Sequence, residues 1–463
     1  MTFASLVFLY GFLPVVLVVY HVLPRKARNV FLLLANIVFY GWGEPQFLLL
    51  IAFSCVTNFL FGKAIGHRRA QQPQTAKKLL VIAIVVDVAL LVVFKYTNFF
   101  TGILHSFFPV LPQSKIPLPL GISFYTFHVL SYLIDVYRGD AQAQKSLVRF
   151  GTYMSLFPQM VAGPIVRYKE IADQLGIRKE TLQRFGSGVV LFCVGLAKKV
   201  LLANQMGRLW ELLQQSSSQL GVLGAWGGAA AFTFQIYFDF AGYSDMARGL
   251  GRMFGFELPL NFNYPYISKS VTEFWRRWHM TLSFWFRDYV YIPLGGSHCS
   301  LKRTLFNVFV VWLLTGMWHG ANWNFIFWGL YYFVFLALEK CFLKKLLDRA
   351  PAFLSHLYTI LVFVVGWVLF SVEELPALGQ YLAAMFGANG LLPGAEAANA
   401  LCMYLPLLVV AAIGSAPLVH KLYQRLPKRA ALAIAGVGCV CVLLLCTASL
   451  ISQGYNPDLY AHF

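Results

Sequence analysis

Long apolar runs recur along the whole chain, and they constrain the fold more than any other feature of the sequence. About a dozen runs of roughly 14–23 residues are long enough, or nearly so, to cross a ~30 Å bilayer core as helices rising ~1.5 Å per residue. The chain is 59% hydrophobic and only 12% charged, whereas soluble domains carry about 25% charged residues. We therefore predict an all-α polytopic membrane protein with about 11–12 transmembrane helices. The spans are expected near residues 3–23, 30–43, 46–62, 79–99, 118–137, 187–204, 224–240, 304–317, 323–339, 353–371, 401–418 and 430–452.

Lysine and arginine residues are concentrated in alternate connections between these runs. If the loop at 24–28 is cytoplasmic, the alternation places 32 of the 37 basic residues in cytoplasmic segments, where Lys and Arg are normally enriched. The 372–400 connection then lies outside, and it contains no Lys or Arg. The net charge of +18 thus indicates orientation and contact with anionic membrane lipids, and we expect no nucleic-acid partner. Both termini are predicted to be extracytoplasmic.

The apolar stretch 150–166 is not counted among the spans. A crossing there would place the basic run 167–184 outside, against the charge pattern. The stretch contains Pro158 and Pro164, and irregular backbone at membrane depth survives only where protein or water covers it. We predict a re-entrant or interfacial segment.

The cysteine and histidine spacings argue against a metal centre. None of the eight cysteines forms a Cys-x-x-Cys pair, and no histidines cluster at ligand spacing. We therefore expect neither a metal site nor a disulfide framework. The sequence also has no Walker A or dinucleotide-binding glycine loop, so no tightly bound cofactor is expected.

Aromatic and basic residues alternate between Thr272 and Asp288. This pattern, which includes Trp275 and Arg276, is typical of a helix lying in the cytoplasmic interface. Interfacial anchoring alone would explain most of the aromatic residues, although the basic face would also suit a phosphate-bearing ligand such as coenzyme A. His279 stands in this segment, and a purely structural role for it stays open.

Acidic residues also occur near membrane depth. Asp87, Asp239 and Asp245 lie in or beside apolar runs, where a carboxylate is kept mainly if it faces a polar cavity or a partner. For Asp239 and Asp245, an ion pair with Arg248 or a backbone donor is the simpler explanation.

The segment around His319 points most directly to chemistry. It joins two apolar arms, Leu305–Met317 and Trp323–Leu338, which as helices span only about 20 and 24 Å. We therefore expect the His319–Asn322 tip to stop inside the membrane or in a cavity, where an ionisable residue is a functional-site candidate. The alternative is a histidine that caps a broken helix. A buried neutral imidazole without metal partners suits general-base removal of a hydroxyl proton, so that the oxygen can attack an activated acyl group.

Several motifs together resemble the membrane-bound O-acyltransferase (MBOAT) superfamily, in particular its bacterial branch that contains the alginate O-acetyltransferase membrane subunit. The similarity extends from the first span to the last residues, and two histidine-centred motifs occur in the family's order. The matching stretches are 119–127, 131–138, Phe157–Arg167, Gln235–Ala247, Asn261–Tyr266, Phe274–Ser283, Gly316–Asn324 and Tyr455–Pro457.

The resemblance implies a funnel-shaped helical fold with a central tunnel, formed by a single membrane domain over residues 1–463. Its core with the histidine motifs would span about 118–339, followed by C-terminal helices at 353–452. The resemblance makes His319 the catalytic histidine and His279 the second histidine of the site. Further substrate-binding candidates, chosen from position only, are Trp275, Arg276, Asp245 and Asn324.

The resemblance also implies an activity and partners. The expected enzyme is an acetyltransferase of the bacterial plasma (inner) membrane, which takes acetyl from cytoplasmic acetyl-CoA or another thioester donor. The acetyl group would pass to an extracytoplasmic SGNH-hydrolase-like partner for O-acetylation of an exported polysaccharide such as alginate. The alternatives are a polytopic transporter or flippase, which should show related halves that we do not find, and a non-catalytic subunit of a polysaccharide export complex.

Overall fold

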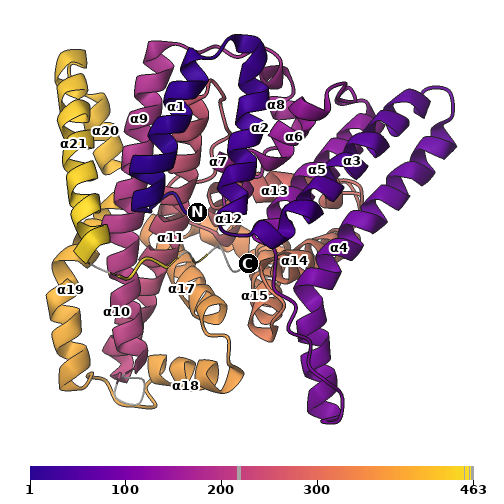
Figure 1. Ribbon diagram of the computed structural model, residues 1–463. Helices are drawn as coiled ribbons and strands as arrows, with labels where there is room; N and C mark the ends of the chain where they lie inside the picture. Colours follow the sequence, from indigo (N-terminus) through magenta and orange to yellow (C-terminus); the bar gives the residue numbers. More distant parts are fainter. Residues whose placement is uncertain (216–219, 453, 458, 460–463) are drawn as a thin grey trace. The chain divides into compact units, whose positions relative to one another are not determined.

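The chain folds into helices, as its apolar runs predict. The computed structural model describes residues 1–215, 220–452, 454–457 and 459, and within these ranges every regular element is a helix (Figure 1). Over the described residues, seven helical stretches are long and apolar enough to cross a membrane. They are Pro45–Arg68, Pro73–Phe107, Leu182–Gln215, Trp323–Arg349, Ala352–Ser371, Ala395–Gly414 and Lys428–Ser452. The all-α polytopic membrane fold is thereby confirmed.

The other expected spans are also helical, but they are shorter or more polar. The stretch 118–137 corresponds to the 17-residue helix Ile122–Arg138, in which 14 residues are buried. A helix covered so completely by protein needs no long lipid-facing apolar stretch. Whether such helices raise the number of crossings to 11–12 stays a prediction.

The chain divides into two compact units, which we describe separately. The first comprises Met1–Phe192 and Tyr243–Leu260, and the second comprises Cys193–Gly242 and Asn261–Leu459. The elements up to residue 175 are η1 (Val7–Phe12), α1 (Leu13–Val22), α2 (Arg25–Gly41), η2 (Pro45–Phe47), α3 (Leu48–Arg68), α4 (Pro73–Phe107), α5 (Ile122–Arg138), α6 (Leu147–Ser155), α7 (Phe157–Met160), α8 (Tyr168–Ile171) and η3 (Asp173–Leu175). Those after it are α9 (Leu182–Ala197), η4 (Lys198–Ala203), α10 (Asn204–Gln215), α11 (Gly221–Met253), η6 (Pro265–Ile267), α12 (Val271–Arg277), α13 (Met280–Phe286), η7 (Arg287–Tyr291), α14 (Leu301–His319), α15 (Trp323–Leu338), η8 (Glu339–Leu343), α16 (Lys344–Arg349), α17 (Ala352–Ser371), α18 (Leu375–Met385), α19 (Ala395–Gly414), α20 (Leu418–Gln424) and α21 (Lys428–Ser452).

In the first unit, α3, α4 and α5 pack side by side (Figure 1), and the segment 150–166 lies buried. Helix α6 ends at Ser155, the short α7 follows, and the chain then continues without regular structure to Arg167. Side chains satisfy this irregular backbone: Asn36 Oδ1 accepts from Phe157 N (3.0 Å), and His128 Nε2 accepts from Val166 N (3.3 Å). Buried backbone requires such partners. The prediction that 150–166 is not a simple span is confirmed, because no continuous helix runs through it; its re-entrant or interfacial placement stays a prediction.

In the second unit, α14 and α15 form a closely packed antiparallel pair (Figure 1). Their backbones approach each other at Gly316 and Gly329, where a side chain would collide with a facing carbonyl oxygen. Helix α15 continues through η8 and α16, so the continuous helical stretch Trp323–Arg349 has 27 residues and contains a window apolar enough to cross a membrane. The expectation that the second arm is too short to cross is therefore wrong, and arm length no longer places the His319 tip inside the membrane.

Asp239 forms a structural ion pair, although its partner is Lys199 of η4 and not Arg248. Both side chains are buried, and the Lys199 ammonium also donates to the carbonyl oxygen of Pro457. Asn204 Nδ2 donates to Asn456 Oδ1 (3.1 Å). These contacts explain the Tyr455–Pro457 motif as a C-terminal segment that satisfies buried polar groups.

Candidate active site

The segment 272–288 is broken into two helices, contrary to the single interfacial helix that its pattern predicts. Helix α12 ends at Arg277 and α13 begins at Met280. Between them, His279 adopts a left-handed backbone conformation with φ +43°, which is uncommon for a residue with a side chain and costs about 1–3 kcal/mol. The break turns His279 inward, and its side chain is buried.

Helix α12 is held by Glu339, a residue that the sequence analysis did not single out. The Glu339 carboxylate accepts from Val271 N (2.7 Å), Thr272 N (2.9 Å) and Thr272 Oγ1 (2.6 Å). It thereby satisfies the N-terminal backbone donors of the helix that carries Trp275 and Arg276. An acidic residue directly after the apolar arm Trp323–Leu338 was the signal that could have revealed this role.

Trp275 belongs to a protein-buried aromatic cluster and does not anchor the chain in lipid. Its ring lies 4.6 Å from Trp312, 5.5 Å from Trp328 and 4.8 Å from Tyr332, measured between centroids. Edge-to-face pairs of this kind add about 0.5–1.5 kcal/mol each to the burial energy. The expectation that these aromatics serve interfacial anchoring is wrong for Trp275, because α15, α17 and the Trp312 ring of α14 pack against α12.

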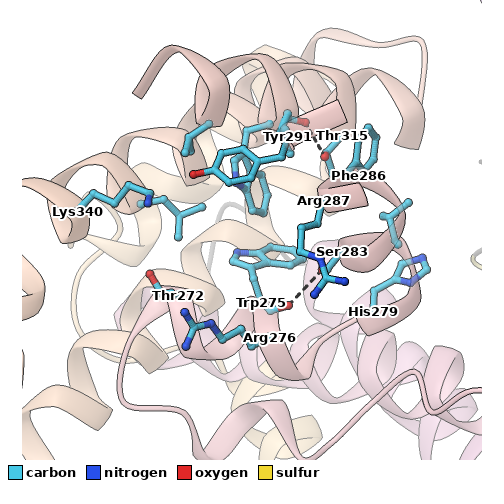
Figure 2. Close-up of a pocket in the computed structure, with 15 residues that line it drawn as sticks. Thr272, Trp275, Arg276, His279, Ser283, Phe286, Arg287, Tyr291, Thr315 and Lys340 are labelled. Atoms are coloured by element: carbon cyan, nitrogen blue, oxygen red, sulfur yellow. Dashed lines mark hydrogen bonds between the residues drawn. The ribbon is translucent and has the colours of Figure 1, made fainter. Parts of the chain in front are cut away.

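A pocket of about 250 Å³ lies beside this cluster in the second unit (Figure 2). Three cationic side chains, Arg276, Arg287 and Lys340, form what we call the cationic rim; all three residues are exposed. The pocket is lined by Thr272, Trp275, Arg276, His279, Leu282, Ser283, Phe286, Arg287, Tyr291, Val308, Val311, Trp312, Thr315, Leu336 and Lys340. Because the described lining has no acidic side chain, the pocket suits an anionic ligand with an apolar or weakly polar arm.

The His279 side chain is held by a hydrogen bond to a residue outside its own helix. Its Nδ1 lies 3.1 Å from Asn261 Oδ1, and the same oxygen accepts from Thr281 N (3.3 Å) and Thr281 Oγ1 (2.9 Å). Its Nε2 is buried and has no hydrogen-bond partner among the described residues. Burial holds the pKa of His279 well below the usual range, because a charged imidazolium would lose its hydration there.

His319 is the last residue of α14 and is only 3% exposed. Its ring packs edge-on against Trp318, Trp328 and Phe370, at centroid distances of 4.9, 5.0 and 5.2 Å. His319 does not line the pocket, whereas Thr315, one turn earlier on α14, does. The two histidines are connected through Trp318, whose ring lies 5.9 Å from that of His279.

The remaining candidates separate into two groups. Trp275 and Arg276 line the pocket with His279, whereas Asn324 and Asp245 do not. Asn324 is buried and donates through Nδ2 to the carbonyl oxygen of Phe370 (2.9 Å), which indicates a structural role. Asp245 belongs to the first unit and forms an ion pair with Arg248 at 3.6 Å. This is the structural ion pair that the sequence analysis gave as the simpler explanation for Asp245.

No group of three or more His, Cys, Asp or Glu side chains is placed to hold a metal ion in the described part of the chain. The rings that surround His279 and His319 are aromatic side chains, which are not metal ligands. The chemistry available at this site is that of imidazole, hydroxyl and indole groups.

Comparison with known proteins decides the family. The family model described as MBOAT, membrane-bound O-acyltransferase family, matches residues 136–379. The chain is 43% identical to the probable alginate O-acetylase AlgI of Pseudomonas aeruginosa over 83% of this chain and 75% of that protein. The chain belongs to the membrane-bound O-acyltransferase family. As a member of this family it is a membrane-bound O-acyltransferase, which confirms the resemblance seen in its motifs.

Two further relatives of this membrane-bound O-acyltransferase cover more of its length or differ in acceptor. The probable alginate O-acetylase AlgI of Pseudomonas putida is 38% identical over 100% of both chains. The peptidoglycan O-acetyltransferase of Helicobacter pylori is 32% identical over 84% of this chain and 80% of that protein. The family region 136–379 contains the pocket and both histidines.

Proposed function

We propose that this protein transfers an acetyl group from a cytoplasmic thioester, acetyl-CoA, for O-acetylation of an exported polysaccharide such as alginate. The single observation that carries the donor assignment is the pocket, which combines the cationic rim with an aromatic interior that reaches His279. Phosphate groups of the donor would lie at the rim, and the thioester arm would extend inward along the wall that Trp275 and Trp312 form. No tightly bound cofactor is needed for this reaction.

In the proposed reaction, a hydroxyl oxygen of the acceptor attacks the carbonyl carbon of the acetyl thioester. His319 accepts the hydroxyl proton, the bond between the carbonyl carbon and sulfur breaks, and the thiolate leaves with the donor and takes up a proton. General-base catalysis of this type contributes about 10²–10⁴-fold. His279 would orient the donor, because it lines the pocket and its ring is linked to that of His319 through Trp318.

The acceptor is proposed from the names of the relatives, which acetylate alginate or peptidoglycan. Delivery to an exported polysaccharide requires the acetyl group to reach the outer side of the membrane. We place both termini outside and the cationic rim on the cytoplasmic side of a bacterial inner membrane, because the 32 basic residues then face the cytoplasm. An extracytoplasmic SGNH-hydrolase-like protein is the proposed partner that completes the transfer.

The test uses inside-out membrane vesicles that contain the full chain, the partner and the polysaccharide, supplied with labelled acetyl-CoA. His319→Ala is compared with wild type at matched, monodisperse protein levels, and His420→Ala serves as control because His420 is exposed on α20. We expect His319→Ala to lower transfer at least ~10²-fold and the control to match wild type. Equal transfer by His319→Ala would refute the general-base assignment.

A second comparison tests the donor pocket. Arg276→Ala should raise the KM for acetyl-CoA, because a phosphate at the rim would lose a cationic partner. Lys345→Ala is the matched control: Lys345 is also exposed and basic, lies on α16 close to Lys340 in sequence, and does not line the pocket. Transfer from a D-alanyl or fatty acyl thioester in place of acetyl-CoA would refute the acetyl assignment.

A further inference from the structure

The hydrogen bonds around Asn261 determine which nitrogen of His279 carries a proton. Thr281 N can only donate a hydrogen bond, so the Asn261 side-chain atom 3.3 Å from it must be the amide oxygen. The Thr281 hydroxyl, at 2.9 Å from the same atom, fits this orientation. The orientation of the amide is therefore fixed independently of His279.

The amide oxygen in turn fixes the imidazole. An amide oxygen accepts hydrogen bonds and cannot donate one, so His279 Nδ1, 3.1 Å away, must carry the hydrogen. A neutral imidazole has one N–H, which leaves Nε2 with a lone pair. The imidazole is buried against the rings of Phe240 and Trp318, and this burial keeps it neutral because a charged ring would lose its hydration.

We propose that Asn261 is a positioning residue that holds His279 as the Nδ1–H tautomer, so that Nε2 accepts a hydrogen bond from the acyl donor in the pocket. The inference rests on the proposed donor site. It goes beyond that proposal because it states that, in the hydrogen bond between the acyl donor and His279, the imidazole accepts. His279 can then bind an N–H or O–H group, such as an amide N–H of the donor's arm. It cannot donate to the oxyanion that forms on the thioester carbonyl.

Trp275 supplies the complementary group. Its indole Nε1–H is buried and has no hydrogen-bond partner in the described ranges, and Trp275 lines the same pocket (Figure 2). Buried polar groups are nearly always satisfied, so an unsatisfied donor and an unsatisfied acceptor on one pocket indicate a ligand or water that satisfies both. A secondary amide, with its C=O and N–H, is a ligand class of that kind.

The direct test is the tautomer itself, measured by nitrogen NMR on the full chain with ¹⁵N-labelled histidine in lipid bilayers. The His279 signals are assigned by their loss in His279→Gln. We expect wild type to show a protonated Nδ1 and an unprotonated Nε2. A protonated Nε2 in wild type would overturn the proposal, whatever the activity measurements give.

Kinetics with two variants separates positioning from a structural role. Asn261→Leu removes the acceptor that fixes the His279 ring, and we expect kcat to fall about 10²-fold, the scale of a reacting group misplaced by about 1 Å. Asn261→Asp keeps an acceptor oxygen and should restore kcat above neutral pH. Asn263→Leu and Asn263→Asp are matched controls, because Asn263 is exposed and lies two residues away on the same segment.

The pH profile gives a readout that a structural role would not move. The carboxylate of Asn261→Asp would favour the imidazolium, raise the pKa of His279 and shift the acidic limb of kcat to higher pH. Among the described residues, the charged or titratable groups near His279 include Arg276, Arg287, Tyr291 and Lys340 of the pocket, the Arg277–Glu273 pair of α12, Asp288 beside Arg287, and His319 beyond Trp318; they are unchanged in this variant. An unshifted limb, or an Asn261→Leu enzyme as active as wild type, would refute positioning.

Failure of the proposed function gives a different result. If wild type transfers no acyl group from any thioester, the donor assignment fails, and the NMR measurement still decides the tautomer. If wild type is active and the tautomer is the opposite one, the positioning role alone is refuted.

Discussion

Gly329 of α15 faces the backbone of α14, and replacing it with alanine tests how the close approach of these helices positions the site. A Cβ atom at Gly329 would lie 2.5 Å from the carbonyl oxygen of Trp312, whereas ordinary van der Waals contact begins at 3.4 Å. The obstacle is a backbone atom, so no change of rotamer can relieve the collision. The helices would have to separate by roughly 0.9 Å, the difference between these two distances.

Overpacking of this kind costs about 1–3 kcal/mol, partly offset by the ~1 kcal/mol that alanine gains over glycine in a helix. Gly438→Ala in α21 is the matched control, because a Cβ there meets nothing within 4 Å. Because both variants replace a helical glycine with alanine, the difference in Tm between them cancels the gain in helix propensity. If the second unit unfolds as one body of about 250 residues, the Tm of Gly329→Ala in nanodiscs should lie about 2–6 °C below that of Gly438→Ala.

The functional effect should be larger than the effect on stability. Trp312 and Thr315 line the pocket and His319 ends the same helix, so a shift of α14 moves all three against α12. A misplacement of about 1 Å can cost 10²-fold in rate. We therefore expect acetyl transfer by Gly329→Ala to fall by about that factor while Gly438→Ala stays active. A Gly329→Ala protein with the Tm and activity of the control would refute the argument from helix approach.

Three further predictions follow from buried groups. Lys199→Met leaves the Asp239 carboxylate buried without its cation, which should lower the unfolding free energy by about 3–5 kcal/mol; a full recovery in Lys199→Met/Asp239→Asn would support the pairing, and an unchanged Tm in the single variant would contradict it. Glu339→Gln weakens the hold on the first turn of α12 and should raise the KM for the donor more than Glu396→Gln, an exposed acid of α19; equal KM values would speak against this role. Burial lowers the pKa of His279, so below about pH 6.5 the unfolded chain binds more protons at this residue than the folded chain does, and the unfolding free energy falls with pH. In denaturation experiments at several pH values, the unfolding free energy of His279→Gln should therefore fall less steeply towards acid pH than that of wild type. Identical slopes would contradict the prediction.

Much of the architecture was predictable from local sequence. Each of the twelve apolar runs coincides with a helix, because burying or embedding an apolar surface depends on residues that are neighbours in sequence. The break at 150–166 was predictable for the same reason, since a proline is tolerated only in the first turn of a helix, and Pro158 indeed lies in the first turn of the short α7. The histidine motifs, being contiguous, likewise indicated the family, which the comparisons confirm; the roles of His279 and His319 stay predictions.

Contacts between distant residues could not be predicted in this way. Asn261 and His279 are separated by 18 residues, and Val271 and Glu339 by 68, so their meeting depends on how whole helices pack. The sequence pattern of 272–288 predicted one interfacial helix, whereas the chain turns at His279, and packing against α15, α17 and the Trp312 ring of α14 buries Trp275. Periodicity reports which face of a helix is apolar, and tertiary packing decides whether that face meets lipid or protein.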